Sequence, residues 1–158
     1  DAVQNSSAAG ISLLVGSNAS EAATYAALDP DVTTHARPLL RREFGNETAA
    51  KIISSYETSS PGATAKEIDM NIMTDERYGI ATLRLADAQS SFAPTYRYYF
   101  SAQCPGLPPQ MKAGHGTEVP FVFGLIPRTN SPADELVRVM GEYWMSFIAR
   151  MARVFPFH

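Results

Sequence analysis

The chain has 158 residues, of which 45% are hydrophobic and 18% are charged, the balance of a folded globular domain rather than of a disordered segment. Its formal net charge of -3 offers no basic surface, so we expect no nucleic-acid partner. No apolar run is long enough to cross a bilayer, so we expect no membrane span.

Two features of the sequence bear on the compartment, and they point in different directions. Cys104 is the only cysteine, which excludes an internal disulfide and favours a reducing compartment such as the cytoplasm. Asn5, Asn18 and Asn46 each open an Asn-x-Ser/Thr sequence, which accepts a glycan only in a secreted chain. We therefore expect a soluble protein, cytoplasmic or secreted.

The chain begins with a predicted strand and continues with helices. The apolar run at 11–15, closed by Gly16, is typical of a strand buried on both faces in a parallel sheet. Residues 31–44 predict a helix that is interrupted at Pro38 and stopped at Gly45.

Two further helical segments follow. Asn46 caps a predicted short helix that runs to about Tyr56. A turn at 60–62 precedes a long helical region at 64–89, and a new cap at Thr74 and Asp75 would divide that region in two.

The last third of the chain predicts one strand, one loop and one helix. Residues 95–101 follow Pro94 and are rich in tyrosine, which is typical of a strand, and a loop covers 104–116. In the final helix Ser131 is the expected cap, Pro132 the first helical residue, and Asp134 the end of a capping box. The helix carries an apolar stripe that we interpret as core, made of Leu136, Met140, Tyr143, Trp144, Phe147 and Met151.

The order strand, helices, strand, loop, helix predicts an α/β fold. Strands joined by helical crossovers should be parallel. A strand buried on both faces needs neighbours on both sides, which two strands cannot supply. We therefore expect these two parallel strands to be one end of a larger sheet.

An acid and a histidine follow the two predicted strands. Glu21 lies shortly after the first strand, and His115 lies between two glycines in the loop after the second. Because the carboxyl ends of parallel strands meet at one edge of a sheet, we expect the two side chains to lie close together. A carboxylate on the imidazole would fix its tautomer and stabilise its protonated form.

Other titratable residues have less suggestive surroundings. Asp29 and Asp31 are rival acids, but they flank Pro30 in a turn and should be solvated. Glu118 has no further His, Cys or acid cluster beside it, so we expect a buried ion pair and no metal. The two remaining histidines should lie at the surface, and the cysteine should be inert; these are His35, His158 and Cys104.

Several segments resemble the type-B carboxylesterases, the family that includes the cholinesterases. The sequence HGTEVPFVFG at 115–124 resembles the histidine segment of that family, and VGSNASE at 15–21 resembles its acid segment. Residues 73–75, the strand at 95–100 and the helix from Ser131 match family elements in order and spacing. Ala22 stands where the family usually has glycine, and the last eight residues lack the usual Gly-Asp-Pro-Asn stretch.

The resemblance implies the carboxyl-terminal part of an α/β-hydrolase fold over residues 1–158, with Glu21 and His115 as the acid and the histidine of a catalytic triad. The triad order in this fold is serine, acid, histidine, so the serine should precede Glu21. No Gly-x-Ser-x-Gly motif occurs in the chain. The resemblance therefore implies an amino-terminal half as partner, which would carry the serine and the oxyanion hole.

Two functions remain open from the sequence. In the first, the chain is part of a serine esterase that acts on small carboxylic esters without a cofactor, and is inactive alone. In the second, it is a non-catalytic cholinesterase-like binding or adhesion module. The presence of both Glu21 and His115 favours the esterase, because a binding module needs neither.

Overall fold

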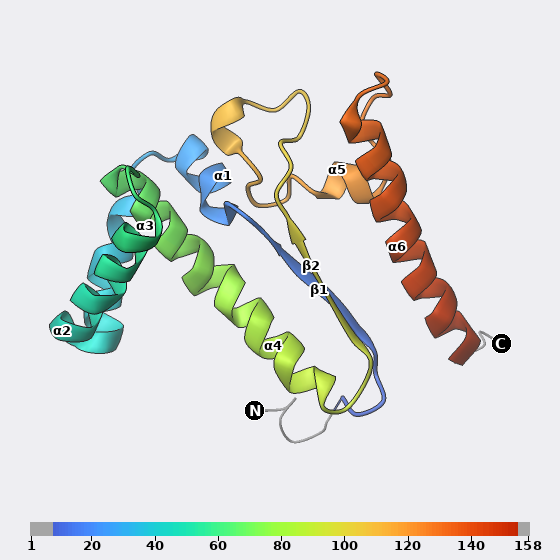
Figure 1. Ribbon diagram of the computed structural model, residues 1–158, viewed down its shortest axis with the longest axis horizontal. Helices are drawn as coiled ribbons and strands as arrows, with labels where there is room; N and C mark the ends of the chain where they lie inside the picture. The colour runs from blue at the N-terminus through green and yellow to red at the C-terminus, as the bar shows by residue number, and fades with distance from the viewer. Residues whose placement is uncertain (1–7, 155–158) are drawn as a thin grey trace.

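The computed structural model describes residues 8–154, and its main elements surround a short parallel sheet (Figure 1). In chain order the strands and α-helices are β1 (Leu13–Asn18), α1 (Glu21–Leu28), α2 (Ala36–Ser59), α3 (Ala65–Thr74), α4 (Ile80–Ser90), β2 (Thr95–Phe100), α5 (Val119–Val122) and α6 (Pro132–Val154). Shorter turns of helix are η1 (Val32–His35), the π-helical η2 (Asp75–Gly79) and η3 (Pro109–Met111).

The sheet pairs β1 with β2 in parallel, which confirms the expected direction of the strands. Leu13 lies opposite Thr95, and Asn18 lies opposite Phe100. Helix α4 lies on one side of this pair and α6 on the other (Figure 1). The first strand begins and ends later than predicted, and its residues 13–16 are half-buried rather than buried. Within residues 8–154 each strand pairs only with the other, which leaves both with an open edge.

One glycine and one proline test the predicted breaks in α2. Gly45 has a φ of 76° and a ψ of 164°, so the axis of α2 breaks there as predicted. Pro38 does not interrupt the helix, because α2 begins at Ala36 and the first turn does not need the missing N–H.

Three other helix ends show which side chains cap them, and a cap was predicted for two of the three. Thr64 caps α3 in a capping box with Glu67. The predicted new cap at Thr74 and Asp75 is wrong: Thr74 makes no side-chain capping bond, and the helical backbone continues from α3 through the π-helical turn η2 into α4. At α6 the Asp134 carboxylate accepts hydrogen bonds from the N–H groups of Thr129 and Asn130. The expected bond to Ser131 is therefore replaced by bonds to residues one and two positions earlier.

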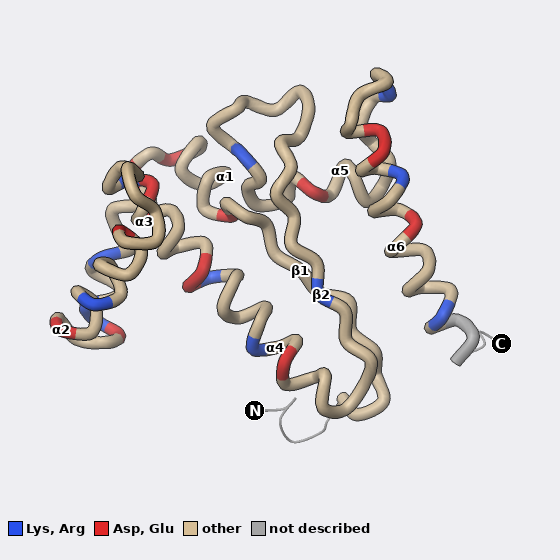
Figure 2. Tube along the Cα trace, viewed as in Figure 1, with Lys and Arg blue, Asp and Glu red and all other residues tan. Residues whose placement is uncertain are grey.

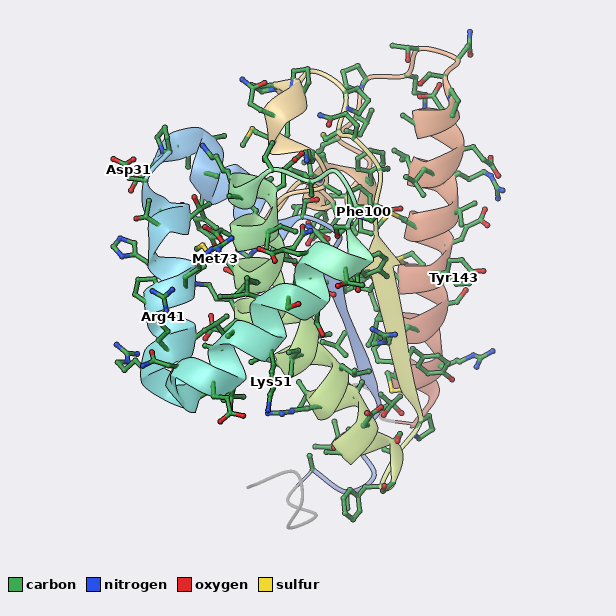
Figure 3. All side chains as sticks on the ribbon, turned by 60° about the vertical axis from the view of Figure 1, so that its left-hand side comes forward. Asp31, Arg41, Lys51, Met73, Phe100 and Tyr143 are labelled. Atoms are coloured by element: carbon green, nitrogen blue, oxygen red, sulfur yellow. The ribbon has the colours of Figure 1, made fainter. Side chains whose placement is uncertain are left out.

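Two hydrophobic clusters hold the elements together. The first joins α1, α2 and α3 and consists of Ala22, Ala36, Leu40, Ala49, Ile53, Ile68, Ile72 and Met73. The second lies beside the end of β2 and consists of Phe100, Cys104, Ala113, Phe121 and Ile126. Figure 3 labels Met73 among the helices and Phe100 at the end of its strand.

Helix α6 covers the sheet with only part of its apolar stripe. Trp144 packs on Tyr98 with ring centroids 6.2 Å apart, and Phe147 packs on Tyr96 at 6.0 Å. Tyr143 is 72% exposed, which corrects its placement in the core, although it lines the space between α6 and the strands. Between α6 and the sheet a cavity of about 660 Å³ remains.

Charged residues are distributed over the helices without a long run of one sign. Figure 2 shows Lys and Arg interspersed with Asp and Glu along the chain. No helix in the described part of the chain is long and apolar enough to span a membrane.

We expect glycine to be required at position 16 in β1. A Cβ there would overlap the ring of Tyr98 on the paired strand. Gly16→Ala should lower the free energy of unfolding by about 1–3 kcal/mol, because the ring must move. Gly141→Ala is the matched control: a Cβ added there would meet nothing within 4 Å, and alanine in a helix should be neutral or stabilising by about 0.5–1 kcal/mol.

Chemical denaturation of both variants measures the difference. Equal unfolding free energies for Gly16→Ala and Gly141→Ala would contradict the packing of Tyr98 on β1.

Candidate active site

The acid of the site is Glu21, the first residue of α1. Only 5% of its side chain is exposed. Its Oε1 accepts a hydrogen bond of 2.7 Å from the N–H of Asn18, at the end of β1. A position in the first turn of a helix also favours a negative charge, because the free N–H groups there carry partial positive charge. The carboxylate is therefore buried, yet supported on one oxygen by the strand that precedes it.

The histidine is held against the same turn of helix by backbone contacts. The N–H of Ser20 donates to the carbonyl of Ala113 at 3.0 Å, and the N–H of His115 donates to the carbonyl of Glu21 at 3.2 Å. The Thr24 hydroxyl donates to the carbonyl of His115 at 3.2 Å. These bonds hold the loop on α1 independently of the side chains of Glu21 and His115.

The side chains of Glu21 and His115 meet as the sequence predicted. His115 Nδ1 lies 2.9 Å from the remaining oxygen of Glu21, Oε2. A carboxylate only accepts hydrogen bonds, so Nδ1 is the donor, and in the neutral ring Nε2 then has the lone pair. The histidine side chain is 48% exposed, and its Nε2 has no hydrogen-bond partner among residues 8–154. The pair thus presents a basic nitrogen at the surface, backed by a buried acid.

Two tyrosines flank the imidazole, and the sequence analysis did not identify them. The ring of Tyr78 lies 4.8 Å from that of His115, and the ring of Tyr25 lies 5.5 Å from it. Their hydroxyls share a hydrogen bond of 2.5 Å. Burial, and then the bond to Tyr25, raises the pKa of Tyr78 to about 12, so this phenol stays protonated near neutral pH. Tyr25 follows Glu21 by four residues, a spacing that places both on one helix face and could have been noticed.

A third neighbour of the site, Asn18, was noted in the sequence only as a possible glycan acceptor. It is 1% exposed, and its Nδ2 donates to the Gly114 carbonyl at 2.7 Å and to Glu118 Oε2 at 2.5 Å. The nitrogen that would carry a glycan is thus enclosed, so the folded chain cannot accommodate one there. The partner of Glu118 is this amide rather than the cation we expected, because the loop turns Glu118 toward the end of β1.

The remaining candidates lie away from this site. Asp29, Asp31 and His35 are exposed, and Figure 3 labels Asp31 at the outer edge of the helices. Cys104 is 3% exposed, and burial raises the pKa of its thiol, in accord with an inert cysteine. His158 lies outside the described residues. Within those residues no group of three His, Cys, Asp or Glu side chains could hold a metal ion.

Comparison with known proteins gives the same family from sequence and from structure. The model of the carboxylesterase family matches residues 2–151. Para-nitrobenzyl esterase of Bacillus subtilis (strain 168) is 33% identical over 127 residues, which are 78% of this chain and 24% of that protein. Cocaine esterase of Homo sapiens is 39% identical over 85 residues, which are 48% of this chain and 15% of that protein.

Solved structures agree. A structure of PNB esterase aligns with a TM-score of 0.71 and 28% identity, over 92% of this chain and 30% of that one. The carboxylesterase of Geobacillus stearothermophilus aligns with a TM-score of 0.73 and 28% identity, over 92% of this chain and 32% of that one. The chain therefore spans less than a third of the length of these relatives. It belongs to the carboxylesterase family, and its fold is that of the α/β-hydrolases.

Proposed function

We propose that this chain supplies the acid and the base of a serine carboxylesterase, with Glu21 orienting His115. The contact that supports the proposal most directly is the 2.9 Å bond from His115 Nδ1 to the buried carboxylate. It leaves Nε2 as the only ring nitrogen able to accept a proton. The exposure of the ring is also what a base needs in order to reach a second reactant.

In the proposed reaction His115 accepts and then donates one proton in each half of the cycle. Nε2 takes the proton of a serine hydroxyl while the serine oxygen attacks the ester carbonyl. The resulting imidazolium, stabilised by Glu21, gives that proton to the leaving alcohol, and an acyl-serine remains. His115 then takes a proton from water, the hydroxide attacks the acyl carbonyl, and the proton returns to the serine oxygen. No step requires a cofactor.

The serine and the oxyanion donors are proposed to come from an amino-terminal part outside these 158 residues. Three observations support this partner. The chain contains no Gly-x-Ser-x-Gly motif. Residues 13–16 of β1 are only half-buried, and the strand has an open edge in the described structure. The relatives are much longer, since the chain covers 24% of para-nitrobenzyl esterase. The names of the relatives indicate ester substrates, and we propose a small carboxylic ester here.

Replacing His115 and Glu21 tests the roles proposed for them. In the enzyme expressed from its complete reading frame, His115→Ala should lower kcat for a chromogenic ester by about 10³-fold or more, because the base is lost. Glu21→Gln should lower it by about 10²–10⁴-fold, since the amide cannot stabilise the imidazolium. His35→Ala is the matched control, an exposed histidine whose loss should leave kcat unchanged.

The proposal also predicts that the 158-residue chain alone does not turn over the ester, because no hydroxyl or thiol among residues 8–154 bonds to Nε2. Robust hydrolysis by the isolated chain would refute the assigned roles. Full activity of His115→Ala in the complete enzyme would do the same, and would favour a non-catalytic binding module.

The loop that presents the histidine provides a further test. A Cβ at Gly114 would overlap the Thr24 side chain and lie 2.5 Å from the carbonyl oxygen of Met111. Gly114→Ala should therefore push the loop off α1 and lengthen the bond from His115 to Glu21. We expect a fall in kcat of about 10²-fold, the effect of a displacement near 1 Å at a reacting group. Gly141→Ala in open space on α6 should retain the parental kcat.

A further inference from the structure

We propose that Asn18 is a positioning residue that fixes Glu21 and the His115 loop relative to each other; this inference rests on the proposed function. Its backbone N–H binds Glu21 Oε1 at 2.7 Å. Its side-chain nitrogen binds the carbonyl of Gly114, directly before His115, and the carboxylate of Glu118, three residues after it. Asn18 thus contacts the acid and the residues that precede and follow the histidine in the loop.

The position of Asn18 in the sheet makes it a rigid support. It is the last residue of β1 and lies opposite Phe100 of β2 in the strand register. The next residue, Ala19, donates its N–H to the carbonyl of Phe100 at 2.8 Å. The sheet therefore holds the backbone of Asn18 on one side, while its donors reach Glu21 at the start of α1 and the loop that carries His115.

The chemistry of the amide matches this role. Both of its acceptors are oxygens without protons, the Gly114 carbonyl and the Glu118 carboxylate, so only the NH₂ group can face them. Each of its two protons has a partner, and the bond to the carboxylate is of the stronger, charge-assisted kind. Reversing the amide would place its oxygen against two acceptors.

The unpaired oxygen of the Asn18 amide lowers stability, which indicates that the two N–H donors of this amide are its important groups. Asn18 Oδ1 is buried and has no hydrogen-bond partner among the described residues. A buried acceptor without a partner opposes folding, and an apolar side chain of similar size would avoid that loss. The two bonds to the loop offset the orphaned oxygen, and they tie the histidine to the end of the strand.

The loop itself needs such a support. Gly116 has a φ of 79°, so the backbone reverses immediately after His115. The Gly114 carbonyl that Asn18 binds also accepts a hydrogen bond of 2.9 Å from the Thr117 hydroxyl. Asn18 and Thr117 thus close this reversal around the histidine. Loss of the Asn18 donors would free the loop to move relative to Glu21.

The test uses the complete enzyme and measures KM together with kcat per active site. The number of active sites is counted from the burst of product released when a chromogenic ester acylates the serine. Asn18→Asp keeps the shape but places a carboxylate against Glu118 and the Gly114 carbonyl. We expect kcat per site to fall by about 10–100-fold, with KM within about twofold. Asn18→Ala removes the donors without adding charge and should lower kcat by about tenfold.

A compensating variant tests the contact with Glu118. In Asn18→Asp with Glu118→Gln, the glutamine amide can donate to the new aspartate. The double variant should recover about tenfold of the kcat lost in Asn18→Asp, because the bond is restored with its polarity reversed. An absence of recovery would overturn the role of the Asn18–Glu118 bond.

Gln89 provides the matched control for a buried amide. It is 3% exposed, and its Nε2 donates to the carbonyls of Ala8 and Ile11 near the other end of β1. Gln89→Glu should lower the melting temperature and the number of titrated sites, but not kcat per site.

Two outcomes separate the inference from the function on which it rests. If His115→Ala is inactive while Asn18→Asp and Asn18→Ala keep kcat per site within about twofold of the parent, the positioning role is wrong and the esterase stands. A loss of sites alone, as expected for Gln89→Glu, would likewise overturn it. If His115→Ala retains full activity, the proposed function itself fails.

Discussion

A hydrogen bond between side chains 94 residues apart, from His115 Nδ1 to Glu21 Oε2, is the contact that the arrangement of this chain serves. It joins a carboxylate that is almost completely buried to a ring that is half-exposed. Burial keeps water from competing for the carboxylate, and exposure leaves the opposite ring nitrogen free. Neither residue could be both buried and exposed, so the bond requires the start of α1 and the loop of His115 to be held together with little freedom.

The parallel sheet meets that requirement with few residues. Pairing of Asn18 with Phe100 brings the ends of both strands to one edge, and the acid and the histidine follow from there. The backbone bond from Ser20 to Ala113 then extends the pairing by one step into the loops. Positioning of the histidine therefore continues the hydrogen bonding of the sheet, rather than depending on long side chains.

Much of this could be predicted from local sequence. The two strands and the break at Gly45 depend on apolar runs and glycine geometry, both of which are local. The meeting of Glu21 with His115 followed from the rule that parallel strands end at one edge. The catalytic roles of both residues stay a prediction, as does the continuation of the sheet beyond these strands.

The contacts that were missed all depend on tertiary placement. Tyr78, which packs on the imidazole, lies in the π-helical turn η2, and a regular helical spacing does not predict the position of a side chain there. Glu118 accepts a hydrogen bond from the Asn18 amide instead of pairing with a cation, because Asn18 is turned inward at the end of β1. Tyr143 shares the spacing of a core stripe and lines the space between α6 and the strands, yet it is 72% exposed. Spacing defines a helix face, and it does not define how closely that face is covered.

The two hydrophobic clusters have a consequence for the geometry of the site. Ala22, next to Glu21, belongs to the cluster of α1, α2 and α3, whereas Ala113, close to His115, belongs to the cluster beside the end of β2. The acid and the histidine are thus anchored in separate packing units and meet at the seam between them. A change in how these two units pack against each other would therefore alter the distance between the acid and the histidine.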